Sequence, residues 1–107
     1  MTVPQISITE PRGPAGAPLV VLGAALGTAT TLWDTATDLL RDRYRVLSFD
    51  HPGHGASPVP LEPFTIADVG AGVLNALDSI GEREFHYAGV SLGGTVGLEL
   101  LLTASDR

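Results

Sequence analysis

The chain has 107 residues, of which 44% are hydrophobic and 17% charged, a composition typical of one small globular domain with a packed core. Its formal net charge is −6 and its six basic residues are arginines scattered along the chain, which argues against nucleic acid or an anionic membrane as a partner. It has no cysteine, which excludes disulfide bonds and cysteine-ligated zinc, and its first residues do not resemble a secretory signal, so we expect a cytoplasmic protein.

The first two predicted elements are strands. Residues 3–9 alternate between two sets of side chains, as in a short strand, and the run 11–14, which contains two prolines and a glycine, ends it. Residues 18–22 form a continuous apolar run, which is typical of a strand buried on both faces. The small-residue loop, defined here as residues 23–28, follows.

A helix is predicted over residues 31–43, with Arg41 and Arg43 near its C-terminal end, where positive charge suits the helix dipole. Its apolar positions recur at helical spacing and are expected to face the core: Leu32, Trp33, Ala36, Leu39 and Leu40. Residues 45–49 then predict a second buried strand.

No regular element is expected in the histidine loop, defined here as residues 50–58, or before residue 63, because prolines recur there. The next helix should start at Thr65, since Asp68 three residues later completes a capping box, and Gly81 should stop it. Its predicted apolar face is Ile66, Val69, Val73, Leu74, Leu77 and Ile80.

The last predicted elements are a strand over residues 85–90 and a helix over residues 92–102. Alternating strands and helices indicate an α/β fold with a parallel sheet and helices on both faces. A complete three-layer sandwich of this kind normally needs a considerably longer chain. The short sheet should therefore have an open edge, and we expect a chain that associates with other copies or with another polypeptide.

Ser91 is the candidate nucleophile. It lies in the run Gly89-Val90-Ser91-Leu92-Gly93-Gly94, which has the spacing Gly-x-Ser-x-Gly between a predicted strand and a predicted helix. A serine at such a sharp turn has a strained backbone, and side chains two positions away on either side would collide. Gly89 and Gly93 would remove that collision.

An activated serine also needs backbone N–H groups where an oxyanion forms. At a turn of this kind one donor is the residue after the nucleophile, Leu92, and we expect the second in the small-residue loop, where we choose Ala25. The alternative for this loop is a plain strand-to-helix turn that requires small residues.

A histidine base is not evident, because no histidine follows Ser91. His51 and His54 follow a strand at the expected carboxyl edge of the sheet, so either could approach the serine. The alternative is a proline-fixed turn in which Asp50 accepts backbone N–H groups. A metal site on these three residues is not expected, since no further ligands stand out. His86, within a strand, is interpreted as a packed or surface residue.

Three blocks together resemble the α/β-hydrolases. They are the run Gly89-Val90-Ser91-Leu92-Gly93-Gly94, the segment Asp50-His51-Pro52-Gly53-His54-Gly55-Ala56-Ser57, and the run from Leu22 to Thr28 with Trp33. They stand in the order and spacing of that family. The resemblance implies that residues 1–107 form the N-terminal portion of a three-layer sandwich, with the later strands, the lid, the catalytic acid and the catalytic histidine outside this chain.

Within the family, the chain is most similar to 3-oxoadipate enol-lactonases, on Leu26-Gly27-Thr28, Leu32-Trp33-Asp34 and the histidine loop. The resemblance implies that Ser91 opens a lactone to an acyl-enzyme, which water hydrolyses without a cofactor. Esterases and cofactor-free haloperoxidase-like members share the same blocks and stay open as alternatives. Haloalkane dehalogenases are disfavoured, because they carry an aspartate at the position of Ser91.

A non-catalytic role is the alternative from a different class. In that reading the chain has inherited the turn around Ser91 and serves as an interaction module that associates through its open sheet edge. The expected partners are therefore a small ester or lactone, and either the missing C-terminal half or another copy of the chain.

Overall fold

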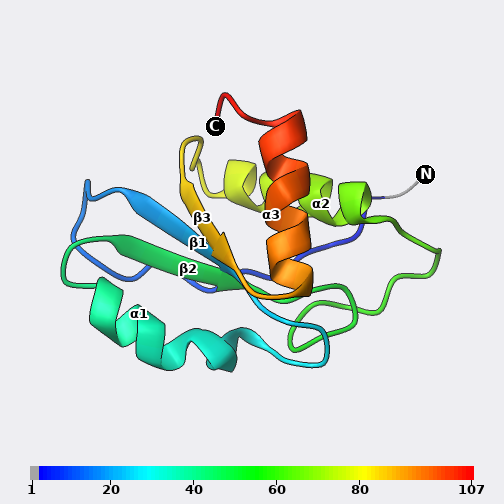
Figure 1. Cartoon of the computed structure of the whole chain (residues 1–107), viewed down its shortest axis with the longest axis horizontal. Helices are drawn as coiled ribbons and strands as arrows, with labels where there is room; N and C mark the ends of the chain where they lie inside the picture. Colours follow the sequence, from blue (N-terminus) through cyan, green and yellow to red (C-terminus); the bar gives the residue numbers. More distant parts are fainter. Residues whose placement is uncertain (1–2) are drawn as a thin grey trace.

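The structure is a computed structural model that describes residues 3–107, so residues 1 and 2 of the expected 1–107 portion lie outside the described part. Three parallel strands form one sheet in the order β2-β1-β3 (Figure 1). They are β1 (Leu19–Gly23), β2 (Arg45–Phe49) and β3 (His86–Gly89). The central strand pairs Val21 with Leu47 on one side and with Tyr87 on the other. The carboxyl ends of the three strands therefore meet at one edge.

Helices cover both faces of this sheet. The short 3₁₀ helix η1 (Thr30–Trp33) and helix α1 (Asp34–Leu40) lie on one face, while α2 (Ile66–Ser79) and α3 (Leu92–Thr103) pack together on the other (Figure 1). This arrangement confirms the predicted α/β class with helices on both faces. Three layers are thus already present in this chain.

The core lies between the sheet and the pair α2–α3. Val21 and Phe49 from the strands, Val73 and Leu77 from α2, and Val96 from α3 are completely buried together. The capping box of α2 is formed as predicted, since Asp68 Oδ2 accepts the Thr65 N–H at 2.9 Å and Thr65 Oγ1 accepts the Asp68 N–H at 3.2 Å. The helix therefore starts where local sequence predicts it to start.

The strand predicted over residues 3–9 is not a regular strand. The N-terminal segment pairs antiparallel with β2 only at two isolated bridges, Ile8 with Phe49 and Arg12 with Val46. Between the two bridges the register shifts by one residue, as in a bulge, and Pro11 has no N–H to donate. The segment still covers the outer edge of β2 and leaves β3 as the open edge.

The helix predicted over residues 31–43 is shorter and packs less tightly than expected. It begins as η1, and α1 ends at Leu40, before both arginines. Leu32 and Leu39 are 47% and 77% exposed, and the buried residue of α1 is Thr37. A helix of two turns presents only one narrow stripe to β2, so most of its apolar side chains remain outside the core.

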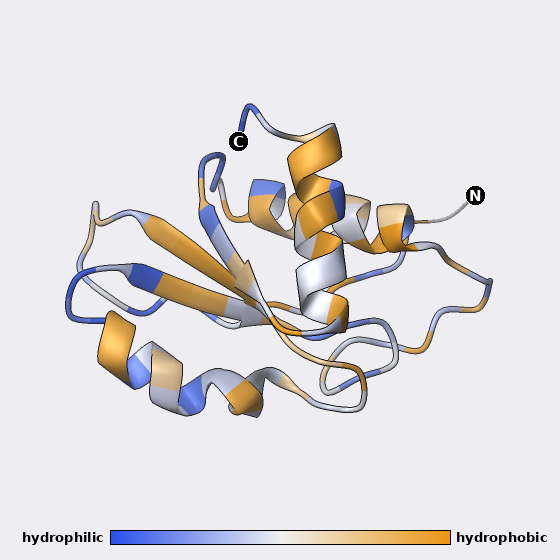
Figure 2. Ribbon diagram, viewed as in Figure 1, coloured by the Kyte–Doolittle hydropathy of each residue, from blue (hydrophilic) through white to orange (hydrophobic). Residues whose placement is uncertain are grey.

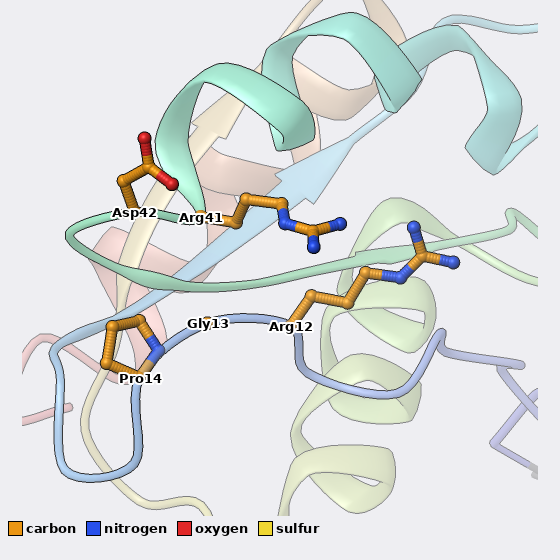
Figure 3. A pocket seen from close by; sticks show the side chains of 5 residues that line it. All are labelled: Arg12, Gly13, Pro14, Arg41 and Asp42. Atoms are coloured by element: carbon orange, nitrogen blue, oxygen red, sulfur yellow. The ribbon is translucent and has the colours of Figure 1, made fainter.

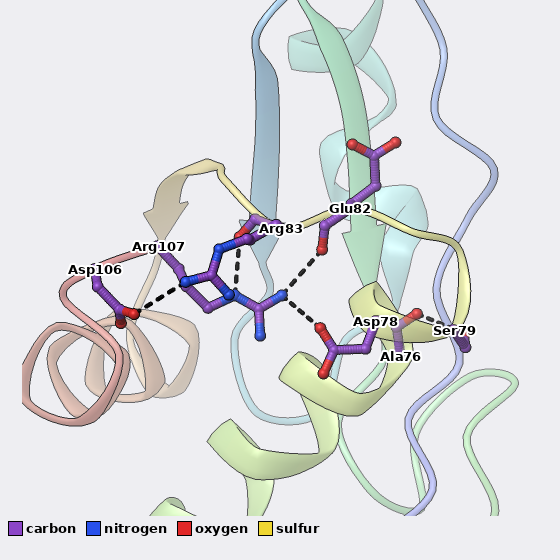
Figure 4. A network of polar contacts seen from close by, with 7 residues as sticks. All are labelled: Ala76, Asp78, Ser79, Glu82, Arg83, Asp106 and Arg107. Carbon is purple, nitrogen blue, oxygen red and sulfur yellow. Dashed lines mark hydrogen bonds and ion pairs between the residues drawn. The ribbon is translucent and has the colours of Figure 1, made fainter.

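The last residues return to the start of β3. Arg107 donates from Nη2 to Asp78 Oδ1 at 2.7 Å and to the Glu82 carbonyl at 3.0 Å, and from Nε to the Arg83 carbonyl at 2.8 Å (Figure 4). The Phe85 N–H donates to the Arg107 carbonyl at 3.2 Å. The chain leaving α3 is therefore held beside the open edge of the sheet.

The apolar residues of α3 extend around the helix (Figure 2). Val96 and Leu100 are buried against the sheet and α2, whereas Leu98, Leu101 and Leu102 are 65%, 65% and 81% exposed. Among residues 3–107, the helices are all too short or too polar to cross a membrane.

Candidate active site

Ser91 lies at the sharp turn between β3 and α3. Its backbone angles are φ 55° and ψ −117°, and it is the only residue other than glycine with positive φ among residues 3–107. An L-residue in this conformation costs about 1–3 kcal/mol, which the surrounding structure must supply. The serine is exposed at the carboxyl edge of the sheet, where ligands bind in open α/β folds.

Close backbone approach explains the glycines on either side of Ser91. A Cβ atom on Gly89 would lie 2.4 Å from the Gly93 carbonyl carbon, and one on Gly93 would lie 2.1 Å from the Gly23 carbonyl oxygen at the end of β1. At the neighbouring Gly94, a Cβ would meet nothing closer than 3.5 Å. The turn therefore needs glycine at positions 89 and 93 but not at 94.

The first turn of α3 presents backbone N–H groups beside Ser91. The Gly93 N–H already donates to the Ala24 and Val90 carbonyls, both at 3.0 Å. Leu92 is the first helical residue after Ser91, and the N–H groups of a first turn have no acceptor within their own helix. The Leu92 N–H also lies at the positive end of the helix dipole, which favours a developing negative charge.

The small-residue loop lies against the same turn. The Gly23 carbonyl accepts the Val90 N–H at 3.1 Å, and the Ala24 carbonyl accepts the Gly93 N–H. The structure thus brings the loop that contains half-buried Ala25 next to Leu92, across a long sequence separation. The Ala25 carbonyl in turn accepts Thr28 Oγ1 at 2.7 Å, which closes the loop on itself.

Neither histidine of the histidine loop has a ring nitrogen that is both unpartnered and exposed, because His51 Nδ1 is buried and both nitrogens of His54 are engaged. His51 is 1% exposed and its Nε2 lies 2.6 Å from the Ala24 carbonyl oxygen. Burial is the main cause that lowers the pKa of His51 below its ordinary value, so the ring is held neutral. His54 is engaged through both nitrogens, with the Gly27 N–H and the Pro52 carbonyl.

The turn alternative for the histidine loop agrees with these contacts. Asp50 is buried and accepts the Thr30 N–H at 3.0 Å and the Ala56 N–H at 2.9 Å. A Cβ on Gly55, which has φ +49°, would lie 2.3 Å from the Asp50 carboxylate. His86, the third histidine, is exposed on β3.

Tyr87 is a residue of the site that sequence reasoning missed. Its hydroxyl donates to the Gly93 carbonyl at 2.6 Å and lies where a Cβ on Gly23 would stand, while its ring lies where a Cβ on Gly97 would stand. Burial raises the pKa of Tyr87, so the hydroxyl stays protonated as a donor. No local pattern around a strand tyrosine indicates this contact, because its partners come from β1 and α3.

A hollow elsewhere on the surface does not belong to this site. Arg12, Gly13, Pro14, Arg41 and Asp42 line about 610 Å³ (Figure 3). These residues lie where β2 begins and α1 ends, which is the amino edge of the parallel sheet. The candidate site at Ser91 is at the opposite, carboxyl edge.

Comparison with known proteins gives a consistent set of similarities. The sequence profile described as "alpha/beta hydrolase fold" matches residues 17–107. The chain is 38% identical over 96 residues to 3-oxoadipate enol-lactonase 1 of Acinetobacter baylyi, which covers 90% of this chain and 36% of that protein. It is 42% identical over 90 residues to a protein of Pseudomonas savastanoi pv. phaseolicola named as a carbamate hydrolase, RutD, covering 82% of this chain and 34% of that protein.

A solved structure, the enol-lactonase from Burkholderia xenovorans, superimposes with a TM-score of 0.89 at 32% identity, covering 95% of this chain and 40% of that one. The chain therefore spans roughly a third of the length of the curated relatives, 36% and 34% of the two above.

Proposed function

The chain belongs to the alpha/beta hydrolase fold family, and we propose that Ser91 is the nucleophile with which it hydrolyses an ester or a lactone. The observation that carries the proposal is the backbone of Ser91, with φ 55° at the turn from β3 into α3. Strain of this kind persists only where surrounding contacts over-determine it, and it clusters at functional sites. Those contacts come from the close backbone approaches at Gly89 and Gly93 and from the Tyr87 hydroxyl.

The chemistry follows from the groups beside Ser91. The Ser91 hydroxyl gives its proton to the triad histidine as its Oγ attacks the substrate carbonyl carbon, and the resulting oxyanion accepts hydrogen bonds from the N–H groups of Leu92 and Ala25. Collapse of the intermediate breaks the bond to the leaving oxygen, which takes the proton back from the histidine, and forms an acyl-enzyme. Water, deprotonated by the same histidine, then attacks the ester carbonyl, and the carboxylic acid product leaves as Ser91 Oγ regains its proton, with no cofactor required. The acid and the histidine of the triad come from outside these 107 residues.

We propose 3-oxoadipate enol-lactone as the substrate. Opening its ring releases an enolate, which becomes a ketone, and hydrolysis of the acyl-enzyme then frees the diacid. Support comes from the similarity to two proteins named as enol-lactonases. A carbamate is the second candidate, favoured by the 42% identity to a protein named as a carbamate hydrolase. A general carboxylesterase or haloperoxidase-like activity is the further alternative within the same family.

The open edge of the sheet supports a partner that completes the domain. The outer side of β3 is unpaired within the described residues, and a groove beside it is lined by Tyr87, Leu98 and Leu101. The Phe85 N–H already pairs with the carbonyl of Arg107 on that side. We propose that the remainder of an alpha/beta hydrolase domain covers this edge, with a second copy of the chain as the alternative.

Covalent labelling tests the nucleophile. A fluorophosphonate should add one phosphonyl group to Ser91, read as a mass shift of the intact protein and assigned by peptide mapping. Ser91→Ala should abolish the adduct, whereas Ser7→Ala, a serine outside the site, should keep it. An unlabelled Ser91 in a well-folded assembly would favour the non-catalytic interaction module instead. Rates of hydrolysis of enol-lactone and carbamate substrates, measured with protein that reacts with the fluorophosphonate, then distinguish the two substrate classes.

Native mass spectrometry tests the partner. A second polypeptide, long enough to make up the difference between this chain and its longer relatives, would support completion by the rest of the domain. Copies of the 11.1 kDa chain alone would support self-association. A folded, monodisperse monomer at low concentration would overturn both.

A further inference from the structure

The histidine loop holds the small-residue loop and its continuation at three points. Asp50 Oδ1 accepts the Thr30 N–H at 3.0 Å, His51 Nε2 lies 2.6 Å from the Ala24 carbonyl oxygen, and His54 Nε2 accepts the Gly27 N–H at 2.9 Å. In the segment 24–30, the contact of His51 lies at the beginning, that of His54 in the middle and that of Asp50 at the end. The segment therefore depends on the histidine loop for its conformation.

The contacts assign the two rings opposite tautomers. A carbonyl oxygen only accepts, so His51 must carry its proton on Nε2, and its buried Nδ1 has no hydrogen-bond partner within residues 3–107. A backbone N–H only donates, so Nε2 of His54 must be bare and its proton must be on Nδ1. That Nδ1–H donates to the Pro52 carbonyl at 3.0 Å.

The contact of His51 fixes the direction of a donor at the site. The Ala24 carbonyl receives two hydrogen bonds, from His51 Nε2 and from the Gly93 N–H at 3.0 Å. In a planar trans peptide the C=O of one residue and the N–H of the next point in opposite directions. Fixing the orientation of the Ala24 carbonyl therefore also fixes the orientation of the Ala25 N–H, the donor proposed for the oxyanion.

We propose that His51 and His54 are positioning residues, fixed in opposite neutral tautomers, that hold the small-residue loop with its backbone donors beside Ser91. His51 acts through the Ala24 carbonyl and His54 through the Gly27 N–H. The tautomers and the contacts are properties of the fold, whereas their catalytic consequence rests on the function proposed above. Neither ring exchanges a proton with the substrate.

Nuclear magnetic resonance of the ¹⁵N-labelled protein near pH 7.5 tests the tautomers without any need for catalysis. Long-range ¹H–¹⁵N correlations should show His51 protonated at Nε2 and His54 protonated at Nδ1, and a coupling across the hydrogen bond should connect the Gly27 amide nitrogen with His54 Nε2. His86, which is exposed on β3, serves as the internal reference. The same tautomer in His51 and His54, or a Gly27 amide without coupling, would overturn the proposal.

Paired variants test the positioning role. In His54→Gln the side-chain oxygen can still accept the Gly27 N–H, whereas in His54→Asn the shorter side chain cannot reach it. We expect His54→Asn to lower the maximal rate of fluorophosphonate labelling of Ser91 about tenfold, with the half-saturating concentration unchanged, because the donors are displaced rather than lost. His54→Gln should restore the rate to within about twofold of the wild type.

Equal maximal labelling rates in His54→Gln and His54→Asn, with both variants folded, would contradict the positioning role. If instead neither the variants nor the wild-type chain is labelled in the folded assembly with the partner that completes the domain, the nucleophile proposal fails. The tautomer assignment is still decided by the resonance measurement. The two failures are therefore distinguishable.

Discussion

The close approach of α3 to the end of β1 makes Gly93→Ala the most informative single substitution. The added Cβ would lie 2.1 Å from the Gly23 carbonyl oxygen and 2.3 Å from its carbon, against about 3.4 Å for ordinary contact. Both atoms are backbone, and the Gly23 carbonyl already accepts the Val90 N–H. The helix start must therefore move by about 1 Å away from β1, since neither neighbour is a flexible side chain.

The expected cost follows from three contributions. Overpacking costs about 1–3 kcal/mol, and loss of the Gly93 N–H bond to the Ala24 carbonyl costs about 1 kcal/mol. Alanine regains up to about 1 kcal/mol of helix propensity over glycine. We expect a net loss of about 2 kcal/mol for Gly93→Ala. Gly94→Ala, whose Cβ meets nothing closer than 3.5 Å, should be neutral or slightly stabilising.

Urea unfolding followed by far-ultraviolet circular dichroism, at one protein concentration, measures both variants. The displaced turn should also slow labelling of Ser91 by about a hundredfold in Gly93→Ala, as expected for a misplacement of about 1 Å. Equal unfolding midpoints for Gly93→Ala and Gly94→Ala would refute the argument that backbone contact with β1 requires the glycine.

Other substitutions test the remaining contacts of the site. Ser91→Gly should be about 1–2 kcal/mol more stable than Ser91→Ala in the same urea titration, because glycine relieves the strain at φ 55° and alanine keeps it; equal stabilities would mean that the turn stores no strain. Tyr87→Phe should lower the free energy of unfolding by about 1 kcal/mol through loss of the hydrogen bond to the Gly93 carbonyl, and no change in midpoint would contradict that contact. His51 has a lowered pKa in the folded protein, so the unfolded chain binds a proton first as the pH falls below about 6.5. The free energy of unfolding should then decrease by at most about 1.4 kcal/mol per pH unit until the folded ring is protonated as well, and His51→Gln should remove this slope between pH 7 and 5.5. A variant with the wild-type slope would show that another group is responsible.

Local sequence patterns predicted the order and type of most elements. The Thr65–Asp68 capping box and the stop at Gly81 depend on residues three or fewer positions apart, and the Gly-x-Ser-x-Gly spacing around Ser91 is equally local, so a short sequence window indicates all three, although the need for glycine at position 93 also involves contact with β1. The apolar run 18–22 and the segment 45–49 were predicted to be buried strands, which is confirmed because β1 and β2 are almost entirely buried.

The predictions that were wrong depend on partners distant in the chain. The N-terminal segment alternates like a strand, but a register shift at β2 and Pro11 interrupt its pairing. The apolar positions of α1 repeat like a core helix, yet Leu39 is 77% exposed because only a narrow stripe of this short helix meets β2. Periodicity reports which side chains share a face, and not how much of that face another layer covers.

The sequence by itself determined the α/β class, the turn at Ser91 and the family resemblance, since each depends on short-range spacing and on the order of the motifs along the chain. Only the tertiary structure decided what the two histidines do. Their ring nitrogens meet Ala24 and Gly27, each 27 positions away, and those backbone groups dictate which nitrogen carries the proton. The same holds for Tyr87, whose hydroxyl is directed by a carbonyl of the next helix, because hydrogen-bond partners depend on how the layers pack against one another.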